Sequence, residues 1–132
     1  MRRWLAALVC LTTLTTLMTA CQAPEPVSLE KQTSSYRVRL RFDATTLGQR
    51  TATVSLSNTD DQPVDADKVT LIPAMSDMNM TGPETQATRV ETGRYEATAE
   101  FFTMLGEWRI TVRIVGAQAT PDSVTFDVTA TP

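Results

Sequence analysis

The sequence predicts an all-β protein, an immunoglobulin-like antiparallel β-sandwich of about seven strands. Apolar and polar residues alternate with a period of two along most of the chain, which is typical of half-buried strands. The alternating runs are short and end at turn-forming residues, and no long window has the 3.6-residue apolar period of a helix. Short strands joined by turns, in a chain of this length, favour two antiparallel sheets packed face to face.

The predicted strands, in chain order, cover residues 36–42, 51–56, 69–72, 89–91, 95–101, 108–114 and 124–128. In the first strand Arg37, Arg39 and Arg41 form a strongly charged outer face opposite an apolar one. The second strand alternates Thr or Ser with Ala, Val and Leu, and the turn-forming segment 58–63 follows it. The third strand is short and ends before Pro73.

The later strands repeat the pattern. The fourth is a short segment that follows a polar stretch, and the fifth begins with Gly93-Arg94-Tyr95, which resembles the tyrosine corner of such sandwiches. The sixth begins with Trp108 after the turn at 105–107, and the seventh closes the chain. The cysteine pair of antibody domains is absent, so Trp108 is the expected centre of the core.

The first twenty residues are expected to be a secretory signal rather than part of the fold. Arg2 and Arg3 precede an apolar run that is too short and too rich in threonine for a membrane span. The run ends in Leu17-Met18-Thr19-Ala20-Cys21, which resembles a bacterial lipobox. That resemblance implies that Cys21 is lipidated and becomes the mature N-terminus, and a plain signal peptide with an incidental cysteine is the alternative.

The predicted organisation is a lipoprotein signal peptide at 1–20, a lipidated N-terminus and tether at 21–34, and the sandwich domain at 35–132. Acyl chains on Cys21 would anchor the protein, since each buried methylene contributes about 0.8 kcal/mol. Gln22 stands where aspartate would be the inner-membrane retention signal of such lipoproteins. We therefore expect a protein of the cell envelope, anchored in the outer membrane and facing the periplasm.

The side-chain inventory argues against an enzyme. The chain has no histidine, and its two cysteines, Cys10 and Cys21, lie in the signal or at its end. A hydroxyl nucleophile would lack its usual base, and the paired acids near residues 60–67 are best explained as solvated turn residues. No phosphate loop or dinucleotide fingerprint is present, and 12 basic against 15 acidic residues argue against nucleic acid as a partner.

Methionines are concentrated in residues 74–80, which read AMSDMNM. Met75, Met78, Met80 and Met104 are the methionines that remain once the signal is removed. Thioether sulfur is a soft, uncharged ligand that favours Cu(I), so this pattern predicts a site for Cu(I), or Ag(I), without histidine. Asp77 and Asn79 would at most shape such a site from outside the ligand set.

Two other interpretations of the methionines stay open at this point. Methionine fills irregular gaps, so the segment could cap the open end of a sandwich, with Met104 as a core residue after Phe101-Phe102. It could also form an adaptable apolar contact for a partner protein.

Three blocks of the chain, at residues 69–80, 90–95 and 102–112, resemble the YtkA-like family and the related FixH-type domains. They contain Pro-x-Met-x-x-Met, Gly-x-Tyr and Met-x-Gly-x-Trp in the family's order. By this resemblance Met75, Met78 and Met104 occupy the family's methionine positions, and Gly93, Tyr95, Gly106 and Trp108 occupy its structural ones. Met80 stands where many members have a histidine, a difference that favours Cu(I) over Cu(II).

The resemblance implies a small secreted or membrane-attached domain of the kind found beside copper-handling machinery and cytochrome oxidase assembly. The leading hypothesis is therefore a non-enzymatic, lipid-anchored periplasmic domain that binds Cu(I) through the four methionines. The alternative is an accessory protein-interaction domain, without a metal site, of a membrane transporter or oxidase complex. A copper transporter or an oxidase subunit is the expected partner.

Overall fold

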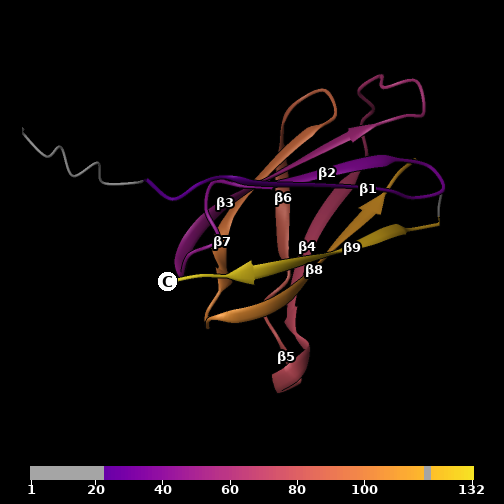
Figure 1. Cartoon of the computed structure of the whole chain (residues 1–132). Coiled ribbons are helices and arrows are strands. Elements are labelled where there is room, and N and C mark those ends of the chain that lie inside the picture. The colour runs from indigo at the N-terminus through magenta and orange to yellow at the C-terminus, as the bar shows by residue number, and fades with distance from the viewer. Residues whose placement is uncertain (1–22, 118–119) are drawn as a thin grey trace, which may run out of the picture.

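The computed structural model describes residues 23–117 and 120–132, and Cys21 and the predicted signal lie outside these ranges. The described part is all-β, as predicted, and consists of antiparallel strands arranged as a nearly closed sandwich (Figure 1). Within the described ranges, no helix has the length and apolar character needed to cross a membrane.

The elements are β1 (Val27–Gln32), β2 (Arg37–Phe42), β3 (Gly48–Ser57), β4 (Lys68–Met75), the 3-10 helix η1 (Ser76–Met78), β5 (Met80–Thr81), β6 (Thr85–Glu91), β7 (Arg94–Phe102), β8 (Gly106–Val115) and β9 (Asp122–Ala130). The strand order is β1-β2-β3-β7-β6-β4-β8-β9, and β5 pairs with β4 beside this path. The first sheet contains β1, β2, β3 and β7, and the second contains β4, β5, β8 and β9. Strand β6 pairs with both β7 and β4, so it joins the two sheets. The strands at the two ends of this order, β1 and β9, also approach each other. Lys31 Nζ of β1 donates to the Thr125 carbonyl of β9 at 2.6 Å.

The core lies between the two sheets and is built from the inward residues of the alternating strands. Trp108 is 2% exposed, which confirms it as a central core residue. Phe102 packs beside it with ring centroids 6.2 Å apart, and Phe42 packs in turn on Phe102 at 5.0 Å and on Phe101 at 5.4 Å. Edge-on aromatic pairs at such distances add to the stabilisation from apolar burial.

Two strands, β1 and β5, were not predicted from the sequence. β1 lies inside the segment 21–34 that was predicted to be a tether, and this boundary is wrong: the sheet begins at Val27. The strand has only Val27 and Leu29 on its apolar face, and it is held by antiparallel pairing with β2 and by an ion pair from Glu30 to Arg39 at 2.7 Å. β5 is the second, and it extends β4 into a hairpin.

Tyr95 has the role expected of a tyrosine corner, in a longer-range form. Its hydroxyl donates to the Ala66 carbonyl at 2.8 Å and accepts from the Ala66 N–H at 2.7 Å. The partner lies 29 residues upstream, in the connection between β3 and β4, rather than a few residues away. Tyr95 therefore fixes this long connection to the sheet.

Candidate functional site

The methionine segment forms a tight hairpin at the end of the second sheet. Met75, the last residue of β4, is the cross-strand partner of Met80 in β5. Four residues connect them, and the turn closes through Asn79, whose φ of 49° is left-handed and whose N–H donates to the Ser76 carbonyl at 3.2 Å. Asparagine tolerates this conformation better than most residues, which accounts for its place in the turn.

The turn sets where the hairpin sulfurs lie. Directly opposed residues of an antiparallel pair point to the same face, with Cβ atoms about 4.5–5.5 Å apart. Met75 and Met80 therefore share one face of the hairpin. Met78 lies in the turn and is 54% exposed, Met80 is 41% exposed, and Met75 is only 5% exposed. The hairpin thus presents two accessible thioethers above a buried one.

Met104 lies in the turn between β7 and β8, two residues before β8 begins at Gly106. Its carbonyl accepts from Trp108 Nε1 at 2.9 Å, which ties the turn to the core, and its side chain is 38% exposed. A Cβ built on Gly106 would lie 3.2 Å from Met75 Cε, so the start of β8 packs directly on the Met75 side chain. The pairing of Ala74 with Arg109 brings the end of β4 to the same place.

Of the four methionines that the sequence singled out, Met75 and Met80 share one face of the hairpin, and Met75 packs against Gly106, two residues after Met104. Three of them are solvent-accessible, and the fourth closes the core beneath them. The described residues contain no group of three or more His, Cys, Asp or Glu side chains that could hold a metal ion. A ligand set at this end of the sandwich would consist of thioether sulfurs.

A hollow of about 330 Å³ lies beside the hairpin and is lined by Ala74, Met75, Ser76, Asn79, Met80, Thr81, Arg109, Thr111 and Thr125. The guanidinium of Arg109 is positively charged, so this hollow is a poor place for a cation.

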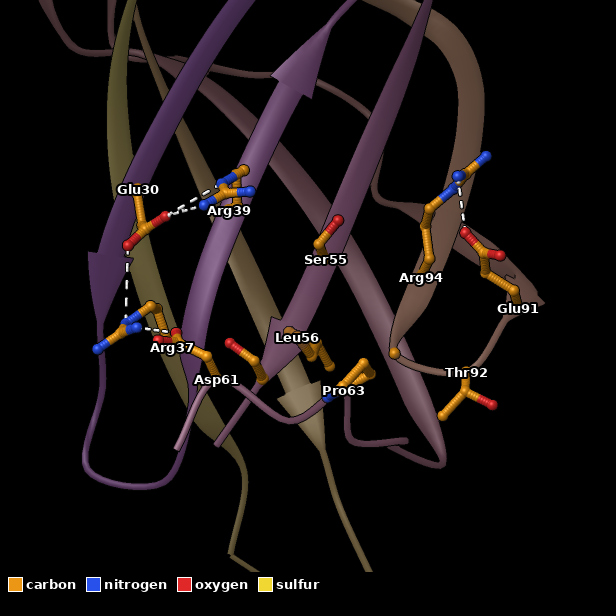
Figure 2. Close-up of a pocket in the computed structure, with 12 residues that line it drawn as sticks. Glu30, Arg37, Arg39, Ser55, Leu56, Asp61, Pro63, Glu91, Thr92 and Arg94 are labelled. Carbon is orange, nitrogen blue, oxygen red and sulfur yellow. Dashed lines mark hydrogen bonds and ion pairs between the residues drawn. The ribbon is translucent and has the colours of Figure 1, made fainter. Parts of the chain in front are cut away.

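A larger hollow, of about 500 Å³, lies at the end of the first sheet where β6 connects to β7. Figure 2 shows that its arginines face carboxylates: Arg37 pairs with Asp61 and Glu30, Arg39 pairs with Glu30, and Arg94 pairs with Glu91 at 2.7 Å. Because each of these positive charges is compensated, the hollow lacks the excess positive potential that would attract an anion. It supplies no comparable candidate site.

Asp65 was interpreted from the sequence as a solvated turn residue, but in the structure it holds two segments together. Its Oδ1 accepts from the Gly93 N–H at 2.8 Å and from Arg89 Nε at 3.0 Å. The Gly93 hydrogen bond, and to a lesser extent Arg89, hold the pKa of Asp65 below its ordinary value. The signal that could have found this role is its position one residue before Ala66, the partner of Tyr95.

A family model described as YtkA-like matches residues 30–113, more than half of the chain, and this span contains all four methionines. No curated protein and no solved structure matches the chain.

Proposed function

The chain belongs to the YtkA-like family, and from that premise we propose that it is a non-enzymatic, lipid-anchored domain of the cell envelope that binds Cu(I), or Ag(I), through methionine thioethers. The observation that carries the proposal is the meeting of the β4–β5 hairpin with the β7–β8 turn. Met75 of the hairpin packs against Gly106, the first residue of β8, and Met104 precedes that residue by two positions in the turn, which supports a ligand set drawn from both segments.

The ligand chemistry selects the ion. Two to four neutral thioethers favour a soft monovalent cation over Ca²⁺, Mg²⁺ or Zn²⁺, which prefer oxygen, imidazole or thiolate ligands. Met78, Met80 and Met104 are exposed enough to bind an ion directly, whereas Met75 would bind only an ion held against Gly106. Asp77 and Asn79 shape the turn without serving as ligands.

Acyl chains on Cys21 would anchor the domain in the outer membrane of the cell envelope, with the domain facing the periplasm. Thioethers do not titrate, so binding should be independent of pH over the range in which imidazole or carboxylate ligands would take up protons. A carrier in a compartment of variable pH would keep its affinity.

The test is a Cu(I) competition titration on residues 21–132 against a chromophoric Cu(I) chelator. We expect the triple change Met75→Leu, Met78→Leu, Met80→Leu to remove the affinity, and Met104→Leu to weaken it. Leucine nearly conserves volume, so each exchange should cost less than about 1.5 kcal/mol of stability, to be checked by urea unfolding. Asp77→Asn is the matched control and should leave the affinity unchanged. An unaltered affinity in the triple variant would refute the proposal.

A second candidate is an accessory interaction domain of a copper transporter or oxidase complex, without a metal site. The exposure of Met78, Met80 and Met104 favours it, because apolar side chains that protrude from turns suit an adaptable protein contact. It predicts no Cu(I) affinity in the titration, together with loss of partner capture in the triple leucine variant.

A further inference from the structure

We propose that the end of the sandwich that carries the methionines docks on the lipid surface to which Cys21 is anchored. The inference rests on the lipidation of Cys21, which is part of the proposed function. It does not rest on metal binding, and its test is carried out without metal.

Apolar side chains are exposed mainly at one end of the described molecule. We call the apolar end the set Leu47, Met78, Met80, Met104 and Leu105, whose side chains are 38–54% exposed. The remaining large exposed apolar residue, Val90, lies in the β6–β7 hairpin at the opposite end. A patch of this kind on an otherwise polar domain is typical of a contact surface.

Strand pairing places these turns at the same end of the molecule. Gly48 pairs with Phe102, which places Leu47 beside the β7–β8 turn that carries Met104 and Leu105. Gly106 pairs with Ala130, and the Met75 side chain packs against Gly106, which brings in the methionine hairpin.

The two exposed leucines share a local structure. Each immediately precedes a glycine with positive φ, +94° at Gly48 and +125° at Gly106. These glycines turn the chain sharply back into β3 and β8, so Leu47 and Leu105 lie at the outermost points of their turns.

The chain enters the fold at this same end. Val27 pairs with Phe42, and residues before it line a hollow of about 350 Å³ together with the last residues of the chain: Pro24, Glu25, Val27, Thr45, Thr46, Thr131 and Pro132. Figure 1 shows the first described residues and the C-terminus on one side of the molecule, with the β7–β8 turn below them.

The tether is short enough to bring this end to the membrane. The chain from Cys21 to Val27 spans at most about 20 Å when fully extended, at about 3.3–3.6 Å per residue. A lipid on Cys21 would therefore hold the apolar end close to the headgroups at a high effective concentration, so that even weak apolar contacts favour docking.

The charge of this end selects the kind of lipid surface. Its segments carry the acids Glu25, Asp43, Asp77 and Glu107 against two bases, Arg50 and Arg109. An acidic surface is repelled by anionic headgroups and tolerated by zwitterionic ones. We therefore expect docking on phosphatidylcholine or phosphatidylethanolamine vesicles that weakens when anionic lipid is added.

The experiment uses the methionines as probes. Cys21 is the only thiol in residues 21–132, so it can be coupled to a maleimide lipid in phosphatidylcholine vesicles. The oxidation of Met78, Met80 and Met104 by dilute peroxide is followed by mass spectrometry, without metal. The reference is the same protein with Cys21 blocked, mixed with the same vesicles. A Val90→Met variant supplies a probe at the opposite end.

We expect severalfold slower oxidation of Met104, Met78 and Met80 in the coupled protein, and an unchanged rate at position 90 in the Val90→Met variant. Exchanging Leu47 and Leu105 together for serine should restore fast oxidation, whereas Val90→Ser should not. Equal rates in the coupled and blocked proteins, or equal protection at both ends, would overturn the proposal. So would protection that requires native membranes, because a membrane protein would then be the partner.

The outcome is separable from that of the proposed function. Loss of labelling by a radioactive fatty acid in cells that carry Cys21→Ser tests the anchor, and the Cu(I) titration tests the metal site. Docking in the vesicle experiment with a failed titration would leave the lipid contact standing.

Discussion

Replacing Gly93 by alanine should destabilise the domain far more than the same change at Gly48, because only Gly93 lies against backbone atoms. Both glycines have a positive φ, +70° and +94°. A Cβ on Gly93 would lie 2.7 Å from the Leu56 carbonyl oxygen and 3.1 Å from the Val64 nitrogen, whereas a Cβ on Gly48 would meet nothing within 4 Å. Gly48→Ala therefore isolates the cost of the backbone conformation.

The magnitude follows from three contributions. A left-handed conformation costs an L-residue about 1–2 kcal/mol at either position. At Gly93 the added methyl group costs about 1–3 kcal/mol more, as in an overpacked core. Displacing the chain would also weaken two hydrogen bonds, from Leu56 N to the Gly93 carbonyl at 2.7 Å and from Gly93 N to Asp65 at 2.8 Å, each worth about 1 kcal/mol. We expect losses of about 1–2 kcal/mol for Gly48→Ala and about 3–6 kcal/mol for Gly93→Ala.

Urea unfolding followed by tryptophan fluorescence measures the difference. Trp108 is the only tryptophan in residues 21–132 and is 2% exposed, so its emission reports the loss of the core. Midpoints should be compared at constant m-value. If Gly93→Ala proves no worse than Gly48→Ala, then the close approach to Leu56 and Val64 is not what requires glycine, and the reasoning fails.

Three further predictions concern the same fold. Tyr95→Phe removes both hydrogen bonds to Ala66 and should lower the free energy of unfolding by about 1–3 kcal/mol, so an unchanged urea midpoint would contradict the corner role. The lowered pKa of Asp65 makes its carboxylate stabilising above the ordinary value of 3.8, and this contribution is lost as the pH falls through the lower folded value. Asp65→Asn should therefore be less stable at neutral pH but lose less stability on acidification than the wild type, and parallel pH curves from urea titrations would contradict this. Met75→Ala should cost about 2–5 kcal/mol because the residue is buried, whereas Met78→Ala should change stability by less than about 0.5 kcal/mol, and equal thermal shifts would show that Met75 does not close the core.

Much of the fold was predictable because period-two alternation is a local signal. The predicted strand at 36–42 differs from β2 by one residue, and those at 95–101 and 108–114 lie inside β7 and β8. β1 was missed for a physical reason. Its short apolar face is too weak to stand out, and it is a strand because β2 lies beside it and its Glu30 faces the arginines of that neighbour.

The candidate site was also predictable only in part. That Met75, Met78 and Met80 lie close in the chain is plain from their spacing, whereas the position of the β7–β8 turn near the end of β4 depends on pairing between β4 and β8, more than 30 residues apart. Only the family resemblance grouped Met104 with the other three methionines. The burial of Met75 was readable in principle, because position 75 continues the inward row of Val69, Leu71 and Pro73.

Met75 belongs both to the core, where it is buried, and to the proposed metal site, where it pairs with Met80. A substitution at Met75 would therefore change the core and the proposed site together. Met75 completes the inward row of β4, is only 5% exposed and packs against Gly106, the first residue of β8. An ion bound there would have to bridge the hairpin and the β7–β8 turn, and by linkage it would stabilise the folded state by about 2.7 kcal/mol at a hundredfold excess over its dissociation constant. An ion held by Met78 and Met80 alone would link only residues of one hairpin, and its stabilisation would be insensitive to Met104. The dependence of metal-induced stability on Met104 therefore distinguishes a site built by the fold from a local methionine cluster.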